Sequence, residues 1–235
     1  MPVRTFVLAA FGLSLAFNFA AMIVRFDWWC VPALLLGWYL ADFASGVIHL
    51  ALDYHPCPDG LGLADIFFYD GSRESDEYLA MRADRIARLT AFQRVVFDFK
   101  THHPRPDALG RRSLWHQIGV SLIAAALPLS LGLNALVIGE RLPGWPIALG
   151  TALIIGSAFA QHFHGCLHRP QVPWYIAALR RSTLLMTPAA HQLHHDTLQR
   201  DFATNCGWSN PVVNRLFVTL RARGMLDDAG LEPRS

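Results

Sequence analysis

The stretch TFVLAAFGLSLAFNFAAMIV, residues 5–24, decides the fold class of this 235-residue chain. It contains no charged residue and matches the length of about 20 apolar residues that a helix needs to cross a bilayer. It is also longer than the apolar run of about 7–15 residues in a cleaved secretory signal. We therefore expect a retained membrane-spanning helix here.

Three further stretches share this character, at residues 28–52, 114–138 and 145–165. Charged residues make up only 16% of the chain and apolar residues 53%, whereas soluble domains average about 25% and 45–50%. The four cysteines show no CxxC spacing, so neither a cysteine zinc site nor a disulfide framework is indicated. The composition predicts an all-α integral membrane protein with four transmembrane helices.

Basic residues lie almost entirely on one side of these spans. Of the 20 Lys and Arg, one precedes the first span, nine fall in residues 53–113 and eight follow residue 165. Because basic segments stay in the cytoplasm, this distribution predicts a multi-pass protein with both termini cytoplasmic. Lys100 is the single lysine, and the preference for arginine suggests a GC-rich bacterial genome, hence a bacterial inner membrane. Topology explains the basic residues, so no nucleic-acid partner is expected.

Residues 76–99 show apolar positions at helical spacing, which predicts one amphipathic helix.

The eleven histidines all fall on that same predicted cytoplasmic side. Residues i, i+3 and i+4 share one face of a helix. His191, His194 and His195 have this spacing, His164 and His168 are four apart, and His49 and Asp53 are four apart. His102 and His103 are adjacent. The sequence thus predicts a cytoplasmic histidine-rich helical cap with metal-ligand spacing on the four-helix anchor.

Three other histidines carry a weaker signal. His55 fits a hydrogen-bonded side chain at the membrane surface better than a ligand, and His162 points away from the face of His164 and His168. His116, beside Trp115 at the start of a span, fits an interface residue and a metal ligand equally well.

The number of candidate ligands bears on which metal is bound. One catalytic zinc takes about three protein ligands, whereas seven to ten histidines and an aspartate suffice for two metals. A histidine-rich two-metal site at a membrane surface points to non-haem iron that activates O₂ to oxidise an unactivated C–H bond. No glycine motif for a nucleotide is present, so electrons must come from a separate donor.

Four motifs resemble those of the Kua/CarF-type lipid desaturase family, which includes plasmanylethanolamine desaturases and a plant plastid palmitate desaturase. They are ADFASGVIHLALD (41–53), THHPRP (101–106), QHFHGCLH (161–168) and HQLHHD (191–196) with the later NCGWSN (205–210). The resemblance implies an O₂-dependent di-iron enzyme that inserts a double bond into a chain of a phospholipid, including the vinyl ether of a plasmalogen. It also implies an electron-transfer partner of the cytochrome b5 or ferredoxin type.

Carried over position by position, the resemblance assigns metal binding and catalysis to nine residues: His49, Asp53, His102, His103, His164, His168, His191, His194 and His195. His116 is a further candidate metal ligand, because it occupies a stretch where the family usually has an acidic residue. The expected organisation is a membrane anchor region at 1–40, the desaturase domain at 41–217 and a tail at 218–235. The segment between Asp53 and His102 is longer than the family pattern leads us to expect.

Other functions fit parts of the pattern. A di-iron lipid hydroxylase uses similar histidine motifs, and the sequence does not separate it from a desaturase. A zinc-dependent membrane hydrolase of the ceramidase type needs fewer histidines than are present. A non-catalytic metal-handling or transport protein calls for polar residues along the spans, which are apolar away from their inner ends. The sequence sets neither the lipid, nor the electron donor, nor the oligomeric state.

Overall fold

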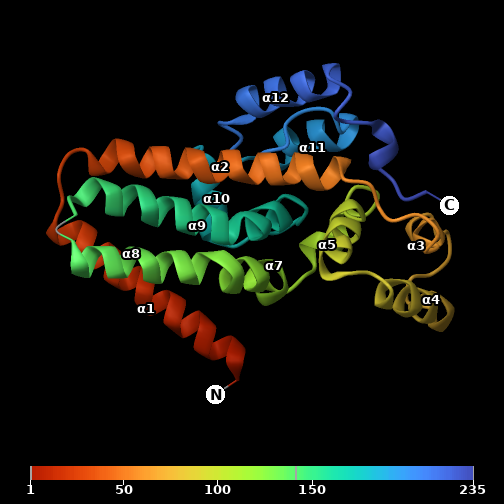
Figure 1. The fold of residues 1–235 in the computed structure, drawn as a ribbon, viewed down its shortest axis with the longest axis horizontal. Helices are drawn as coiled ribbons and strands as arrows, with labels where there is room; N and C mark the ends of the chain where they lie inside the picture. The colour runs from red at the N-terminus through yellow and green to blue at the C-terminus, as the bar shows by residue number, and fades with distance from the viewer. Residues whose placement is uncertain (1, 141, 235) are drawn as a thin grey trace. The chain divides into compact units, whose positions relative to one another are not determined.

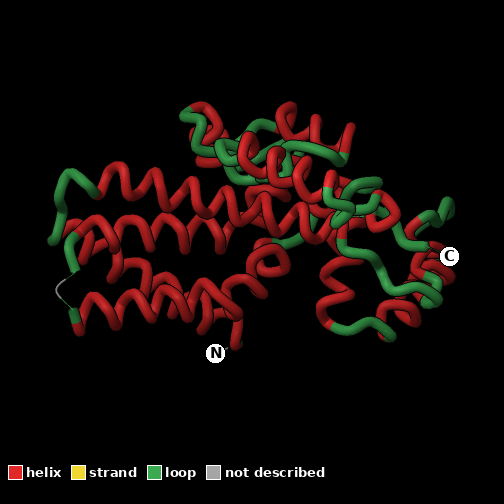
Figure 2. Tube along the Cα trace, turned by 45° about the horizontal axis from the view of Figure 1, so that its top comes forward, coloured by secondary structure: helices red, strands yellow, loops and turns green. Residues whose placement is uncertain are grey.

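The computed structural model describes residues 2–140 and 142–234, and within them every regular element is a helix. Figure 2 accordingly shows helices and loops and no strand in the described part of the chain. This confirms the all-α prediction. The elements, labelled in Figure 1, are α1 (Val3–Val24), α2 (Cys30–Tyr54), α3 (Leu63–Phe67), α4 (Asp76–Ala87), α5 (Ala91–Lys100), α6 (Pro106–Gly110), α7 (Leu114–Ser121), the π-helix η1 (Leu122–Ala126), α8 (Leu127–Gly139), α9 (Gly144–Leu167), α10 (Trp174–Arg181), α11 (Pro188–Thr197), α12 (Asn210–Ala222) and the 3₁₀ turn η2 (Asp228–Gly230).

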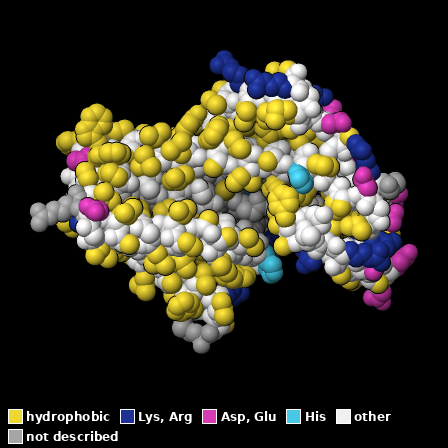
Figure 3. Space-filling model, in the orientation of Figure 1, with side chains coloured by type: hydrophobic (Ala, Val, Ile, Leu, Met, Phe, Trp, Pro, Cys, Tyr) yellow, Lys and Arg dark blue, Asp and Glu magenta, His cyan; other side chains and the backbone are white. Residues whose placement is uncertain are grey.

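Four helical segments are long and apolar enough to cross a membrane, at Val3–Val24, Cys30–Tyr54, Leu114–Gly139 and Gly144–Leu167. They contain 22 to 26 residues, or about 33–39 Å at 1.5 Å per residue, which exceeds the hydrocarbon core of about 30 Å. On the face shown in Figure 3, hydrophobic side chains cover the long helices almost without interruption. The chain is therefore a multi-pass membrane protein, and the four predicted spans are confirmed.

The third span contains one widened turn. It runs through α7, η1 and α8, and Pro128 stands at the start of α8. Proline has no N–H and crowds the preceding turn, so a local π turn accommodates it within a continuous helix. Ser121 beside this turn donates its hydroxyl to the Ala158 carbonyl of α9 at 3.1 Å, which joins the third and fourth spans.

The chain divides into two compact units. Unit 1 comprises Met1–Val47 and Leu109–Asn214, and unit 2 comprises Ile48–Ala108 and Arg215–Ser235. In unit 1, α2 and α9 approach closely at two glycines. A Cβ on Gly37 would lie 2.3 Å from the Leu149 carbonyl oxygen, and one on Gly156 would lie 2.5 Å from the Ala41 Cβ. Larger residues at these points would force the two helices apart.

A buried polar network joins α1 to α8 in unit 1. Ser14 Oγ lies 2.7 Å from Ser130 Oγ and donates to Asn134 Oδ1 at 2.5 Å. Asn134 Nδ2 donates to Asn18 Oδ1 at 2.7 Å and to the Ser14 carbonyl at 3.2 Å. Hydrogen bonds of this kind hold helices together in a bilayer, where apolar surfaces give no hydrophobic preference for one another over lipid.

Unit 2 has its own hydrophobic core of Leu63, Ile66, Phe67, Tyr78, Val96 and Phe97. The prediction of one helix over 76–99 is wrong, because α4 ends at Ala87 and α5 begins at Ala91. Thr90 and Gln93 form a capping box at the start of α5. The box satisfies two backbone N–H groups that a continuous helix would satisfy internally, which favours the break.

Candidate metal centre

In unit 1, two helices bring five histidines together. His164 lies in the last turn of α9 and His168 is its C-cap, while α11 carries His191, His194 and His195. The Thr187 hydroxyl accepts from the Ala190 N–H and Pro188 occupies the first turn, so the sequence starts α11 just before the first histidine. The i, i+3, i+4 spacing then places the three imidazoles of α11 on adjacent positions of the helix.

Three imidazole nitrogens of this group converge. His191 Nε2 lies 3.0 Å from His164 Nε2 and 3.2 Å from His195 Nε2. Ligand atoms of His164, His168, His191 and His195 all lie within 4.8 Å of one another. Two imidazoles bound to one metal at about 2.0–2.1 Å have their nitrogens about 3.0–3.5 Å apart, depending on coordination geometry. The spacing of these nitrogens therefore fits ligands of a common cation.

The protonation chemistry agrees with metal binding. A neutral imidazole offers one lone pair, which is the form that a metal binds. Burial, with a smaller contribution from His194, lowers the pKa of His168 to about 4. His168 is therefore neutral at pH 7 and able to act as a ligand.

His194 has a support of its own within unit 1. Its Nδ1 lies 2.9 Å from the Arg200 carbonyl oxygen, and its ring contacts Phe202 with centroids 5.0 Å apart. Because a carbonyl only accepts, Nδ1 must carry the proton and Nε2 the lone pair. This is the usual arrangement by which an outer hydrogen bond sets the tautomer of a ligating histidine.

The backbone around α11 takes up an uncommon conformation at three residues. Thr183, Leu198 and Asp201 have φ values of 59°, 54° and 59°. Such values are rare outside glycine, and for a β-branched residue such as threonine they are true outliers. Strained backbone of this kind gathers at functional sites, and in this chain it brackets the histidine helix.

Unit 2 holds a second group, at the last turn of α2 and the residues that follow α5. His49 Nε2 lies 3.3 Å from Asp53 Oδ2, and His103 Nε2 lies 3.4 Å from Asp53 Oδ1. The Asp53 side chain is fully buried and His49 is 2% exposed. A buried carboxylate needs a cation or several donors nearby, and this one has two imidazoles. The group offers mixed nitrogen and oxygen ligands of the kind that iron and zinc accept.

His102 adjoins this second group. Its ring centroid lies 4.2 Å from that of His103 and 5.6 Å from that of His49. Its Nδ1 contacts the Phe99 carbonyl oxygen, which places the proton on Nδ1 and the lone pair on Nε2. Within unit 2 the structure thus gathers His49, Asp53, His102 and His103, as their sequence spacing predicts.

Lys100 supports the second group, although no sequence motif assigned it a role. Its side chain is fully buried, and its ammonium donates to the Asp53 carbonyl and, at 2.6 Å, to the Gly230 carbonyl. Burial lowers the pKa of Lys100. The residue ties the end of α2 to the C-terminal segment. The one sequence signal that could have drawn attention to Lys100 is that it is the only lysine in an arginine-rich chain.

The three other histidines lie outside these groups. His116 is exposed at the start of α7, and its Nδ1 lies 2.7 Å from Ser113 Oγ, so the structure does not bring it into the unit 1 group. His162 is buried, with Nδ1 2.8 Å from Gln117 Oε1 and Nε2 3.3 Å from the Tyr175 hydroxyl. His55 is exposed and packs on Phe92.

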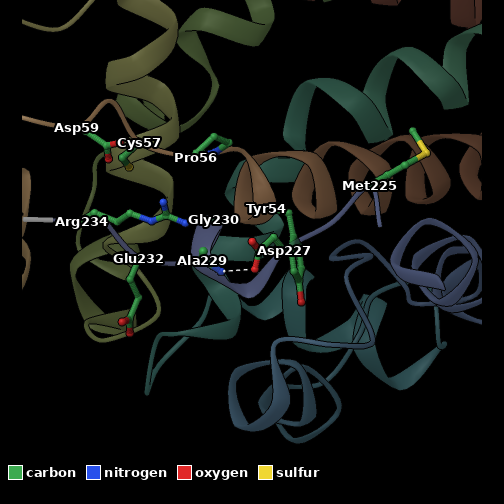
Figure 4. A pocket seen from close by; sticks show the side chains of 10 residues that line it. All are labelled: Tyr54, Pro56, Cys57, Asp59, Met225, Asp227, Ala229, Gly230, Glu232 and Arg234. Carbon is green, nitrogen blue, oxygen red and sulfur yellow. Dashed lines mark hydrogen bonds between the residues drawn. The ribbon is translucent and has the colours of Figure 1, made fainter. Parts of the chain in front are cut away.

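Unit 2 also contains a cavity of about 370 Å³ between the end of α2 and the C-terminal segment (Figure 4). Its lining includes Asp59, Asp227, Glu232 and Arg234, and no histidine. Asp227 accepts a hydrogen bond from the Ala229 N–H at 3.0 Å, drawn as the dashed line. None of the candidate metal ligands lines this cavity.

Similarity to known proteins agrees with this geometry. The model of the lipid desaturase domain matches residues 88–235. A plasmanylethanolamine desaturase from Myxococcus xanthus is 24% identical over 212 residues, which cover 88% of this chain and 64% of that protein. The chain thus spans just under two thirds of the length of this relative. No solved structure matches.

The family match covers more than half of the chain, including α5, the residues His102 and His103, and the histidines of α9 and α11. It agrees with the resemblance that the four motifs indicated. The chain belongs to the lipid desaturase domain family.

Proposed function

We propose that the protein is an O₂-dependent lipid desaturase with two irons, one held by each histidine group. The observation that carries the proposal is the convergence of His164, His191 and His195 within about a ligand spacing of one another. Membership of the lipid desaturase domain family and the four membrane spans support it. In this reading His164, His168, His191 and His195 serve one iron, His49, Asp53 and His103 serve the other, and His102 and His194 complete the ligand sets.

Iron bound by such ligands would supply the activation of O₂ that oxidation of an unactivated C–H bond requires. The residues of the chain do the rest. Neutral imidazoles provide lone pairs, and hydrogen bonds from Nδ1 of His102 and His194 to backbone carbonyls hold their rings in place. The buried Asp53 carboxylate offsets part of the positive charge of the metal.

The balance of the reaction requires a partner. Forming a double bond removes two hydrogens from neighbouring carbons, and full reduction of O₂ to water requires two further electrons and two protons. The sequence has no nucleotide-binding glycine motif, so we assign these electrons to a separate donor of the cytochrome b5 or ferredoxin type.

We place the substrate in the membrane, as a chain already attached to a phospholipid. The name of the Myxococcus relative indicates an alkyl ether phospholipid. We therefore propose an ether lipid of this class, with a vinyl ether as product. The arginine distribution favours both termini and the histidines on the cytoplasmic side of a bacterial inner membrane.

Mass spectrometry of intact lipids tests the reaction. Cells that make the protein, with the alkyl ether lipid supplied, should contain a product lighter by two hydrogens. His194→Ala should abolish that product while the protein stays in the membrane. His55→Ala, at an exposed histidine outside both groups, should leave it unchanged.

Three other outcomes would refute the proposal, and each would point to a different function. A lipid heavier by one oxygen would identify a hydroxylase, and a shortened lipid would identify a hydrolase. No change in any lipid, from protein with both metals bound and a competent donor supplied, would exclude a lipid-oxidising enzyme.

A further inference from the structure

Asp42 is a buried acid in the middle of a membrane-spanning helix, and the function proposed above does not use it. Its side chain is fully buried. Oδ1 accepts the N–H groups of Cys206 and Gly207 at 2.8 and 3.0 Å. Oδ2 accepts the N–H and the hydroxyl of Ser209 at 2.9 and 2.7 Å. Ionisable groups inside a membrane are expensive and persist when the protein satisfies them.

The residues that satisfy Asp42 belong to a non-helical loop, and this loop is attached at several other points to α2 and α9. The Thr204 N–H donates to Ser45 Oγ at 3.2 Å, and Asn205 Nδ2 donates to the Gly156 carbonyl at 3.1 Å. A second stretch joins it, since the Met186 N–H donates to the Asn205 carbonyl at 2.7 Å. Trp38 Nε1 donates to the Leu184 carbonyl at 2.8 Å.

These attachment points lie deep along the spans. Gly156 is twelve residues into α9 and His164 is twenty, which at 1.5 Å per residue puts them about 18 and 30 Å along the helix. The hydrocarbon core is about 30 Å thick. If the hydrocarbon core begins near Trp145, its other boundary falls near His164. Gly156 and the loop bound to it then lie about 12 Å inside that second boundary. Asp42, twelve residues into α2, gives the same depth.

The distribution of charged residues on either side of α11 agrees with this depth. Residues 184–190 (LLMTPAA) and 202–214 (FATNCGWSNPVVN) contain no charged side chain. The charged residues between them are Asp196, Arg200 and Asp201, at the opposite end of α11 from the attachment points. Exposed side chains at the uncharged ends are Thr187, Pro188, Ala189, Pro211 and Val212. Such residues are compatible with contact to lipid.

We propose that the two uncharged stretches, residues 184–190 and 202–212, dip into the bilayer from the histidine side while the charged end of α11 stays at that side, with Asp42 as their anchor. Irregular backbone is tolerated at membrane depth only where protein groups satisfy it. The carboxylate of Asp42 and the amides of residues 206, 207 and 209 satisfy one another in this way.

The topology has a consequence for the site, which rests on the proposed function. α11 would lie at the hydrocarbon boundary, so that a phospholipid chain reaches His191 without leaving the bilayer. The topology itself does not depend on the reaction, and the following experiment tests it without any measurement of activity.

Thiol alkylation in membranes tests the insertion. Single cysteines are placed at Ala189, Val212 and Gln199 in a Cys206→Ala background, and N-ethylmaleimide is applied to the full chain in membranes. The three other native cysteines are buried. Because the thiolate reacts and low dielectric raises the pKa of a thiol by more than one unit, the Ala189→Cys and Val212→Cys thiols should react at least about tenfold more slowly than Gln199→Cys. All three should react equally after denaturation in detergent. Equal rates in membranes would overturn the proposal.

Asp42→Asn tests the anchor. Asparagine has an NH₂ group in place of one carboxylate oxygen. This NH₂ group would face one or two of the backbone N–H groups that donate hydrogen bonds to Asp42, and it cannot accept them. Alkylation of Ala189→Cys should then rise toward the rate at Gln199→Cys, while Cys30, buried at the start of α2, stays protected. A segment that stays protected in Asp42→Asn would refute the anchoring role. If Cys30 also becomes reactive, Ser209→Ala, which removes one of the four hydrogen bonds, gives the same comparison in a milder variant.

Discussion

Replacing His191 by alanine should weaken the metal site of unit 1 more than any exposed histidine substitution. His191 is the central imidazole of that group, with Nε2 atoms of His164 and His195 at 3.0 and 3.2 Å. Structural zinc sites of four ligands bind with about 10–16 kcal/mol, or about 2.5–4 kcal/mol per ligand. At about 1.4 kcal/mol per tenfold, loss of one ligand weakens binding by about 10²–10³-fold.

A chelator competition measures this change. Purified protein is loaded with Fe(II) without oxygen, titrated with a chelator, and the metal retained per chain is determined. The wild type should lose its metal in one range of chelator concentration. His191→Ala should lose part of it at a concentration about 10²–10³-fold lower. His55→Ala is the matched control and should follow the wild type. If His191→Ala retains all its metal as the wild type does, the assignment of the unit 1 group is wrong.

Three further substitutions test the supports of the two units. Lys100→Met removes two charge-assisted hydrogen bonds from buried carbonyls, at about 1.5–3 kcal/mol each. Limited proteolysis should therefore cut the C-terminal segment near residue 230 faster than in the wild type, and unchanged cleavage would contradict this role. Asn134→Ala removes three hydrogen bonds between α1 and α8, so the free energy of unfolding should fall by about 2 kcal/mol at about 0.6 per bond. Leu136→Ala, on an exposed side of α8, is the control, and equal losses in the two variants would argue against the network. Gly156→Ala puts a Cβ 2.5 Å from that of Ala41 and should cost about 1–3 kcal/mol. Gly132→Ala, with open space around it, should cost less, and the reverse order would contradict the close approach of α2 and α9.

The spans and the histidine spacing could be predicted from the sequence because both depend on local pattern. A charge-free run of helical length specifies a span, and i, i+4 spacing puts His164 with His168 and His49 with Asp53 on one helix face. The break between α4 and α5 also has a local sequence signal, but the prediction of one helix over 76–99 followed the amphipathic pattern instead. Thr90 and Gln93 have the spacing of a capping box, which marks the start of a helix.

Other features of the site could not be predicted, because they join residues far apart in the chain. Asp42 and Ser209 are 167 positions apart, and Lys100 and Gly230 are 130 apart. In the sequence Asp42 reads only as an interruption of a span. Its role is visible once the amides of residues 206, 207 and 209 are seen to point at its carboxylate.

The metal content of active protein tests the central claim most directly. The enzyme, purified from membranes in a form that desaturates its lipid, is analysed for all transition metals and the amount of each per chain is determined. The account predicts two irons per chain, and loss of activity in step with the loss of iron. One zinc per chain and no iron, with activity intact, would contradict it.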